Sequence, residues 1–201
     1  MILYRIATET RQHPADDLSG RGAALGPGRW NDAGQAVVYA ATTRAMAVLE
    51  TAAHLPACGL PLNRYLVEIE VDAQVWRKRT RWSQDELPIG WDAVPAGLSS
   101  VARGAAWFAA GKTALLEVPS VIVPEEGVVV IHPMHPDARA MRARNAGAQG
   151  AGVGIRPVVS LAACAREGAE SRAPHGQPRS ASIRRSLGKL FCPPCCLQDL
   201  L

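Results

Sequence analysis

The stretch Gly26–Glu50, GPGRWNDAGQAVVYAATTRAMAVLE, places a glycine-rich turn, a short apolar run and a helix-like segment in close succession. The apolar run Ala36–Ala41 predicts a buried strand. A hydroxyl at Thr42 or Thr43 can accept a free amide N–H in the first turn of a helix, so we expect a helix from there to about Leu55. The stretch therefore predicts a turn, a strand and a helix joined by short connections.

Three side chains in this stretch, Arg29, Tyr39 and Glu50, suggest more than a structural role. Arg29 lies among glycines, which let a ligand approach the backbone closely, and its planar guanidinium suits phosphate oxygens. Tyr39 can stack on a flat heterocycle and form a hydrogen bond through its hydroxyl. Glu50 lies on a largely apolar helix face, where a carboxylate is costly unless it is paired or used. Its helical neighbours are Met46, Ala47, Ala53 and His54. Each residue alone also fits an ordinary reading: a surface arginine, a core tyrosine and a glutamate that reaches solvent.

Outward from this stretch, short strands and helices alternate without a regular order. Apolar or alternating runs predict strands at Ile2–Ile6, Asn63–Val71, Ala114–Val118, Ser120–Pro124 and 127–133. The alternation in Asn63–Val71 is typical of a half-buried strand. A helix is expected at Ser99–Ala110, with Val101, Ala105 and Phe108 on one side. Residues 9–28 are expected to be mostly loop with one helical turn, and residues 76–95 a charged, tryptophan-rich connection. This mixture favours an α+β fold, with helices packed against a mixed sheet.

The composition excludes several classes of protein. The 201 residues contain no apolar run of about 18, so we expect no membrane helix, and the first residues lack the pattern of a signal peptide. A cytoplasmic location is the simplest interpretation. Five cysteines, most of them near one end, do not indicate a disulfide scaffold. His132 and His135 lie in a proline-broken segment, and CPPCC has no second ligand pair, so no metal site is expected. The standard glycine-rich nucleotide motifs are also absent.

The last third of the chain differs in amino-acid composition from the rest. Residues 141–201 are rich in Ala, Arg, Gly and Pro, and residues 138–201 carry 10 of the 22 Lys and Arg but 3 of the 18 Asp and Glu. Such a segment buries too little apolar surface to offset its ordering entropy. We therefore divide the chain into a domain at residues 1–140 and a poorly ordered tail at 141–201. A basic tail can attract nucleic acid, but we interpret this one as solvated and expect no direct nucleic-acid binding.

Seven short motifs, in this order, resemble the RES domain family. They are YRI at Tyr4–Ile6, GRWN at Gly28–Asn31, Tyr39-Ala40, a helix carrying Glu50, Gly104 with Trp107, VPS at Val118–Ser120 and HPD at His135–Asp137. Each motif is weak, but their succession over roughly residues 2–138 is specific.

The resemblance implies a fold and a function. The fold would be similar to that of ADP-ribosyltransferases, with a split mixed β-sheet core, flanking helices and a cleft for NAD. The protein would be the toxin of a bacterial toxin–antitoxin pair, with a helix-turn-helix antitoxin of the Xre type as its partner. It would break the nicotinamide–ribose bond of NAD by phosphorolysis or hydrolysis, with phosphate as a possible co-substrate and no prosthetic group. The alternatives are ADP-ribosyl transfer to a protein, or an inactive remnant that still binds its antitoxin.

The resemblance also suggests roles for individual residues. Glu50 would stabilise the positive charge on the ribose or hold a ribose hydroxyl. Arg29, together with Arg5, would bind the pyrophosphate, and Tyr39 would stack on or orient the nicotinamide. Ser120 would form a hydrogen bond with the nicotinamide ribose or the amide. Catalysis is thus assigned to Glu50, Arg29 and Ser120.

The chain departs from the family pattern at two places. His132-Pro133 stands where the family usually has Asn-Pro, and no aromatic and acidic motif of the F.FD.RL type follows His135–Asp137. The composition from about Arg142 onward is that of a shifted reading frame in GC-rich DNA. We therefore hypothesise that these residues are foreign to the fold and that the sheet lacks an edge strand.

Overall fold

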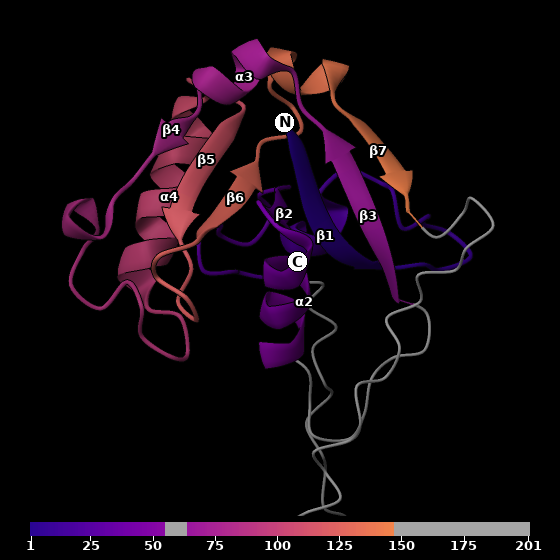
Figure 1. The fold of residues 1–201 in the computed structure, drawn as a ribbon. Coiled ribbons are helices and arrows are strands. Elements are labelled where there is room, and N and C mark those ends of the chain that lie inside the picture. Colours follow the sequence, from indigo (N-terminus) through magenta and orange to yellow (C-terminus); the bar gives the residue numbers. More distant parts are fainter. Residues whose placement is uncertain (55–63, 147–201) are drawn as a thin grey trace, which may run out of the picture. The chain divides into compact units, whose positions relative to one another are not determined.

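Seven strands form one sheet in the computed structural model, which describes residues 1–54 and 64–146. The strand order is β4-β5-β6-β2-β1-β3-β7, with β4 and β7 at opposite edges (Figure 1). Neighbouring strands are antiparallel except β4 and β5, which are parallel. The strands are β1 (Ile2–Thr8), β2 (Val38–Ala41), β3 (Arg64–Glu70), β4 (Thr80–Arg81), β5 (Leu115–Pro119), β6 (Gly127–Ile131) and β7 (Arg142–Asn145).

Helices are few and short beside this sheet, so the fold is α+β with a mixed sheet, as expected. They are α1 (Arg21–Ala24), α2 (Arg44–Ala53), α3 (Ala73–Arg77), α4 (Leu98–Ala110) and the 3₁₀ helices η1 (Gln84–Glu86) and η2 (Pro136–Ala140). The ladder between β1 and β2 consists of the pair Tyr4↔Ala41 in the described residues. This narrow junction separates the β4-β5-β6-β2 part of the sheet from the β1-β3-β7 part, which fits the split core of an ADP-ribosyltransferase-like fold.

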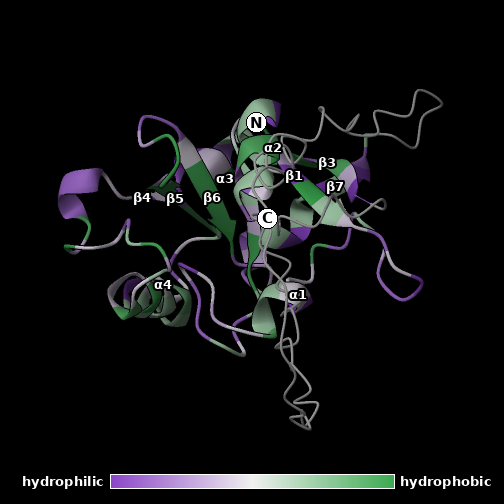
Figure 2. Ribbon diagram, turned by 90° about the horizontal axis from the view of Figure 1, so that it is seen from below, coloured by the Kyte–Doolittle hydropathy of each residue, from purple (hydrophilic) through white to green (hydrophobic). Residues whose placement is uncertain are grey.

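Alternate side chains of the strands fill two layers of core, because successive residues of a strand point to opposite sides. One set meets α4 and α2: Leu116, Val118, Val128 and Val130 pack with Trp107, and Ile6, Ala41 and Leu66 pack with Met46 and Ala47. The other set, which includes Leu3, Val67, Ile69 and Leu115, packs with Val75 and Trp76 near α3 and with Ala138 and Met141 around η2. Figure 2 shows the strongly hydrophobic character of β5 and β6.

Helix α2 begins as expected, because the Thr43 hydroxyl accepts the Met46 N–H at 3.1 Å. The helix ends at Ala53, and the predicted end at Leu55 lies outside the described residues. Its buried face carries Met46, Ala47, Glu50 and Thr51. Glu50 is therefore turned towards the sheet and not towards solvent.

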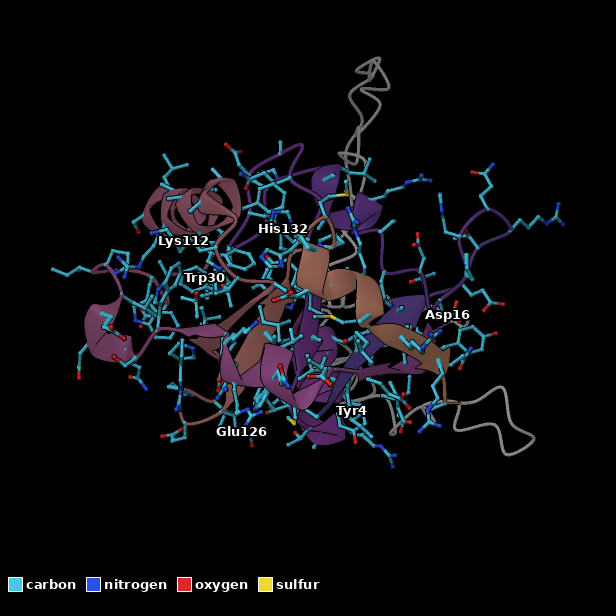
Figure 3. All side chains as sticks on the ribbon, turned by 90° about the horizontal axis from the view of Figure 1, so that it is seen from above. Tyr4, Asp16, Trp30, Lys112, Glu126 and His132 are labelled. Carbon is cyan, nitrogen blue, oxygen red and sulfur yellow. The ribbon has the colours of Figure 1, made fainter. Side chains whose placement is uncertain are left out.

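Helix α4 packs with a different side from the one that we expected. Its buried residues are Ser100, Gly104 and Trp107, whereas Val101, Ala105 and Phe108 are half-buried. The cause is a close approach to Trp30, which lies between α4 and the sheet (Figure 3). A Cβ on Gly104 would lie 2.2 Å from the carbonyl oxygen of Trp30, so a glycine is required there.

Two strand predictions need correction. Residues 120–124 form a turn and not a strand, because the Ser120 hydroxyl accepts the N–H groups of Ile122 and Val123 at 3.0 and 3.1 Å. These local bonds replace a sheet ladder. Strand β3 is also more deeply buried than a half-buried strand, since Glu68 is 5% exposed. Its carboxylate accepts hydrogen bonds from Arg44 at 2.6 Å and from Arg144 at 2.9 Å.

The predicted loss of an edge strand is wrong. Residues Arg142–Asn145 form β7, which pairs with β3 through four residues and supplies Arg144 to Glu68. The connection at 76–95 also contains more structure than expected, namely the end of α3, then β4 and η1. The predicted tail beyond residue 146 and all five cysteines lie outside the described residues. None of the described helices is long and apolar enough to cross a membrane.

Candidate active site

Four of the predicted site residues line one pocket of about 430 Å³: Arg29, Tyr39, Glu50 and Ser120. They come from the loop before β2, from β2 itself, from α2 and from the turn after β5. A pocket of this size falls within the range of about 300–1,000 Å³ typical of small-molecule sites. Its walls also contain apolar residues, which include Val94, Pro95, Ala96, Val121, Ile122 and Val128. The pocket thus combines a carboxylate and a guanidinium with apolar surface.

Glu50 and Ser120 form the polar centre of this pocket. The Ser120 hydroxyl donates to Oε1 of Glu50 at 2.5 Å, and both residues are buried, with 1% of Ser120 and 6% of Glu50 exposed. Because the same hydroxyl oxygen accepts the N–H groups of Ile122 and Val123, its proton is directed at the carboxylate. Ser120 therefore fixes the position of the glutamate, in addition to any contact with a ligand.

The Tyr39 hydroxyl forms hydrogen bonds with two residues of the loop that carries Arg29. The hydroxyl donates to Oδ1 of Asn31 at 2.8 Å and accepts the Trp30 N–H at 3.0 Å. Burial raises the pKa of this hydroxyl well above its ordinary value, so it stays protonated. The ring is 6% exposed. The described contacts of Tyr39 therefore tie β2 to the loop that carries Arg29.

Arg29 extends from that loop into the pocket. Its Nη1 donates to the carbonyl oxygen of Trp91 at 2.5 Å. Burial lowers the pKa of the guanidinium, and the negative charge of Glu50 acts in the opposite direction. An arginine keeps its charge under such shifts. The pocket therefore presents a partly desolvated cation within the electrostatic reach of a buried carboxylate.

Arg5 is absent from the described lining of this pocket. It lines a second pocket of about 360 Å³, which shares Tyr39 with the first and also contains His13, Asp17 and Arg21. The register of β1 explains this separation, because Ile6 of the same strand packs towards α2 while Leu3 and Ala7, in the same alternate set as Arg5, belong to the other core layer. Within residues 1–54 and 64–146 no group of three or more His, Cys, Asp or Glu side chains is placed to hold a metal ion.

His132, where the sequence departs from the family pattern, lies against α4 and is absent from the described lining of the candidate pocket. Its ring stacks on Phe108 with centroids 4.1 Å apart and is 9% exposed. Burial, with a smaller effect from His135, lowers its pKa. His132 therefore contributes to the packing beside α4 and not to the described lining of the pocket.

Sequence reasoning did not select two residues that the structure places in or beside the pocket. Asn31 is fully buried, and its amide donates to the carbonyl oxygens of Ala23 and Asp32 at 3.0 and 3.1 Å, which closes the loop around Arg29. The sequence already pointed to Asn31, because it is the last residue of the GRWN motif. His54 lines the pocket one helical turn after Glu50, so the spacing of four residues indicated a shared face.

Comparison with known proteins places this chain in a family. The model of the RES domain matches residues 2–150. The chain belongs to the RES domain family. A "Prs ADP-ribosylating toxin" of Sphingobium sp. (strain YBL2) is 55% identical over 141 residues, which cover 70% of this chain and 88% of that protein. Two proteins named "Toxin Res" are also similar. The one from Photorhabdus laumondii is 34% identical over 68% of this chain and 85% of its own length. The one from Yersinia enterocolitica is 31% identical over 67% and 86%.

The relatives of this RES domain are thus toxins, and one is named for ADP-ribosylation. The matched range extends past the motifs recognised in the sequence and includes β7. This agrees with the structure, in which β7 completes the sheet beside β3.

Proposed function

We propose that this RES domain is a toxin enzyme that breaks the nicotinamide–ribose bond of NAD. The observation that carries the proposal is the buried pair of Glu50 and Ser120, which holds a carboxylate at a fixed position in a pocket shared with Arg29. Breaking this bond develops positive charge on the ribose, as in glycoside cleavage. A preorganised carboxylate stabilises that charge most effectively where water is excluded.

Three parts of NAD, the nicotinamide, its ribose and the pyrophosphate, have a suitable counterpart in the pocket. The apolar walls formed by Val94, Pro95 and Ile122 suit the flat nicotinamide ring. Arg29 supplies a cation for the pyrophosphate, and burial strengthens its attraction to an anion. Glu50 would meet the ribose with the carboxylate oxygen that does not accept from Ser120. Nicotinamide leaves as a neutral molecule, because the bonding electron pair returns to the ring nitrogen, so the leaving group needs no proton.

The role of Tyr39 in this proposal is chiefly one of positioning. Its hydroxyl already donates a hydrogen bond to Asn31 and accepts one from the Trp30 N–H. Its ring contributes to the pocket wall beside the nicotinamide, while its hydroxyl holds the Arg29 loop in place. A contact of Arg5 with the pyrophosphate stays a prediction, because Arg5 lines a second pocket that shares Tyr39 with this one.

The acceptor of the ADP-ribosyl group can be a protein, water or phosphate. We favour transfer to a protein, because the Sphingobium relative, at 55% identity, is named a Prs ADP-ribosylating toxin. The protein Prs, after which that relative is named, is therefore the first acceptor to test. Hydrolysis and phosphorolysis of NAD use the same bond cleavage and differ only in the nucleophile, so they remain the second candidates.

A toxin of this kind needs a partner that restrains it in the producing cell. We propose an antitoxin of the helix-turn-helix Xre type, in agreement with the toxin names of the relatives, and a bacterial cytoplasm as the site of action. Coexpression with the neighbouring gene product and copurification of the two proteins would test this part independently of the chemistry.

The experiment that tests the reaction is product analysis. Purified protein is incubated with NAD and Prs, with and without phosphate, and the products are identified by mass spectrometry. The proposal expects nicotinamide release, and the acceptor follows from where ADP-ribose appears: on Prs, as free ADP-ribose, or as its 1″-phosphate. Intact NAD under all conditions, with correctly folded protein, would overturn the proposed function.

A further inference from the structure

We propose that His54 is the general base that removes the proton from the acceptor nucleophile. This inference rests on the proposed function, because it concerns the second half of the same reaction. His54 lines the pocket that contains Glu50 and Ser120, at the C-terminal end of α2. It lies four residues after Glu50 on the helix, and such residues share a face. The imidazole is exposed, as a group that meets an incoming acceptor must be.

The hydrogen bond of the imidazole determines which nitrogen is basic. Nδ1 of His54 lies 2.7 Å from the backbone carbonyl oxygen of Glu50. A carbonyl oxygen can only accept, so Nδ1 carries the proton and donates it to this bond. In the neutral ring the lone pair is therefore on Nε2. The bond also fixes the orientation of the ring, as a second group does for many catalytic histidines.

A neutral acceptor loses a proton as it bonds to C1, and Glu50 is poorly suited to take that proton. The carboxylate must remain negative while the ribose is positive, and taking up a proton would remove this stabilisation. Among the other described lining residues, Ser120 donates its proton to Glu50, Arg29 is cationic and Tyr39 donates to Asn31. His54 is the remaining side chain of the described lining with a nitrogen lone pair suited to accept a proton.

The transfer exchanges one bond at C1 of the nicotinamide ribose for another. The bond between C1 of the nicotinamide ribose and the ring nitrogen breaks, and its electron pair gives neutral nicotinamide. A lone pair of the acceptor hydroxyl, amine or water forms the new bond to C1, and the acceptor proton passes to Nε2 of His54. The resulting imidazolium lies at the C-terminal end of α2, where the helix carbonyls favour a positive charge. The proton is then released to solvent.

The test uses His54→Asn, because the asparagine amide can keep the hydrogen bond to the Glu50 carbonyl oxygen but has no basic lone pair. Nicotinamide release is measured with Prs or water as acceptor, and again with azide, an anion that needs no deprotonation. His13→Gln, on a loop that lines the other pocket, is the control.

We expect His54→Asn to lose activity with Prs or water by on the order of 10²-fold or more. Azide should restore nicotinamide release to near the wild-type level. An unchanged rate without azide, or a loss that azide does not restore, would overturn the role of His54 as base. If the wild-type protein releases no nicotinamide with any acceptor, the proposed function itself fails. The same azide assay on Glu50→Gln, which should not be rescued, separates the two residues.

Discussion

The hydroxyl of Ser120 and the carboxylate of Glu50 meet at 2.5 Å although the two residues are 70 positions apart in the chain. One comes from the turn after β5 and the other from the buried face of α2. Two backbone N–H groups hold the serine oxygen from the opposite side. The contact therefore joins the turn after β5 to helix α2 at the point where the pocket forms, and it gives the carboxylate a defined position with no ion pair to a cation of the described residues.

Replacement of Ser120 by alanine should affect both stability and turnover. The N–H groups of Ile122 and Val123 lose their acceptor, which should cost about 1–3 kcal/mol of unfolding free energy. Without its donor, Glu50 is less well placed, so kcat for nicotinamide release should fall more than KM for NAD rises. Denaturant unfolding and steady-state kinetics measure the two effects. Ser99→Ala, at an exposed position of α4, serves as the control. An unchanged kcat in Ser120→Ala would show that the serine does not position Glu50.

Removal of the Tyr39 hydroxyl should loosen the loop that carries Arg29. In Tyr39→Phe, the Trp30 N–H and Oδ1 of Asn31 lose their partner in a buried site, with an expected loss of about 1–3 kcal/mol. Because Arg29 is adjacent, KM for NAD should rise several-fold. Tyr65→Phe on β3 is the matched control. If Tyr39→Phe binds NAD as tightly as the wild type, the hydroxyl has no part in placing Arg29.

Substitution of Gly104 tests the packing of α4. An alanine Cβ would lie 2.2 Å from the Trp30 carbonyl oxygen and 2.5 Å from its carbonyl carbon, so the helix or the loop must move. Such overpacking typically costs about 1–3 kcal/mol or more. Gly97→Ala at the start of α4 is a suitable comparison, because its added Cβ would meet its nearest atom at 3.7 Å. Thermal unfolding of the two variants measures the difference, and equal melting temperatures would contradict the close contact.

Glu68 should make stability dependent on pH in the acid range. The hydrogen bond from Arg44, with a further contribution from Arg144, lowers the pKa of this carboxyl below its ordinary value of 4.5. A lowered pKa in the folded state stabilises the fold above the unfolded pKa, and this stability is lost as pH falls through the folded pKa. Glu68→Gln should therefore be less stable than the wild type near neutral pH, and the difference should shrink below about pH 4.5.

The control for this experiment is Glu70→Gln on the same strand, because Glu70 is exposed. It should change the pH dependence of the unfolding free energy much less. A constant difference between Glu68→Gln and the wild type from pH 3 to pH 7 would contradict the stabilising role of the two arginines.

The sequence predicted the local elements better than the contacts between them. The strand that contains Tyr39, the Thr43 cap and the helix that carries Glu50 follow from patterns within a few residues. The segment from Ser120 to Pro124 was predicted as a strand because its β-branched residues have strand propensity. It forms a turn because the Ser120 hydroxyl accepts two backbone N–H groups of the same segment. The alternation in β3 could not show that Glu68 is buried, since its arginines lie 24 residues before it and 76 after it.

The site was predictable only in part, because short motifs identify residues but do not show which of them meet in space. The motifs identified Arg29, Tyr39, Glu50 and Ser120, and the structure brings these four together. Arg5 was assigned to the same ligand because it belongs to the YRI motif. It lines a second pocket that shares Tyr39 with the first, so its contact with the ligand stays a prediction. Likewise, β7 has no apolar pattern, and only its pairing with β3 makes it part of the sheet.

Nicotinamide release by Glu50→Gln tests directly whether the buried carboxylate stabilises the positive ribose. The glutamine oxygen can still accept from Ser120, so the variant keeps the shape and the hydrogen bond of the buried pair while it loses the negative charge. We predict a fold and melting temperature close to those of the wild type, and a fall in nicotinamide release on the order of 10²-fold or more. Glu125→Gln, at an exposed position, should leave the rate unchanged. A folded Glu50→Gln protein that releases nicotinamide within twofold of the wild-type rate would contradict the central claim.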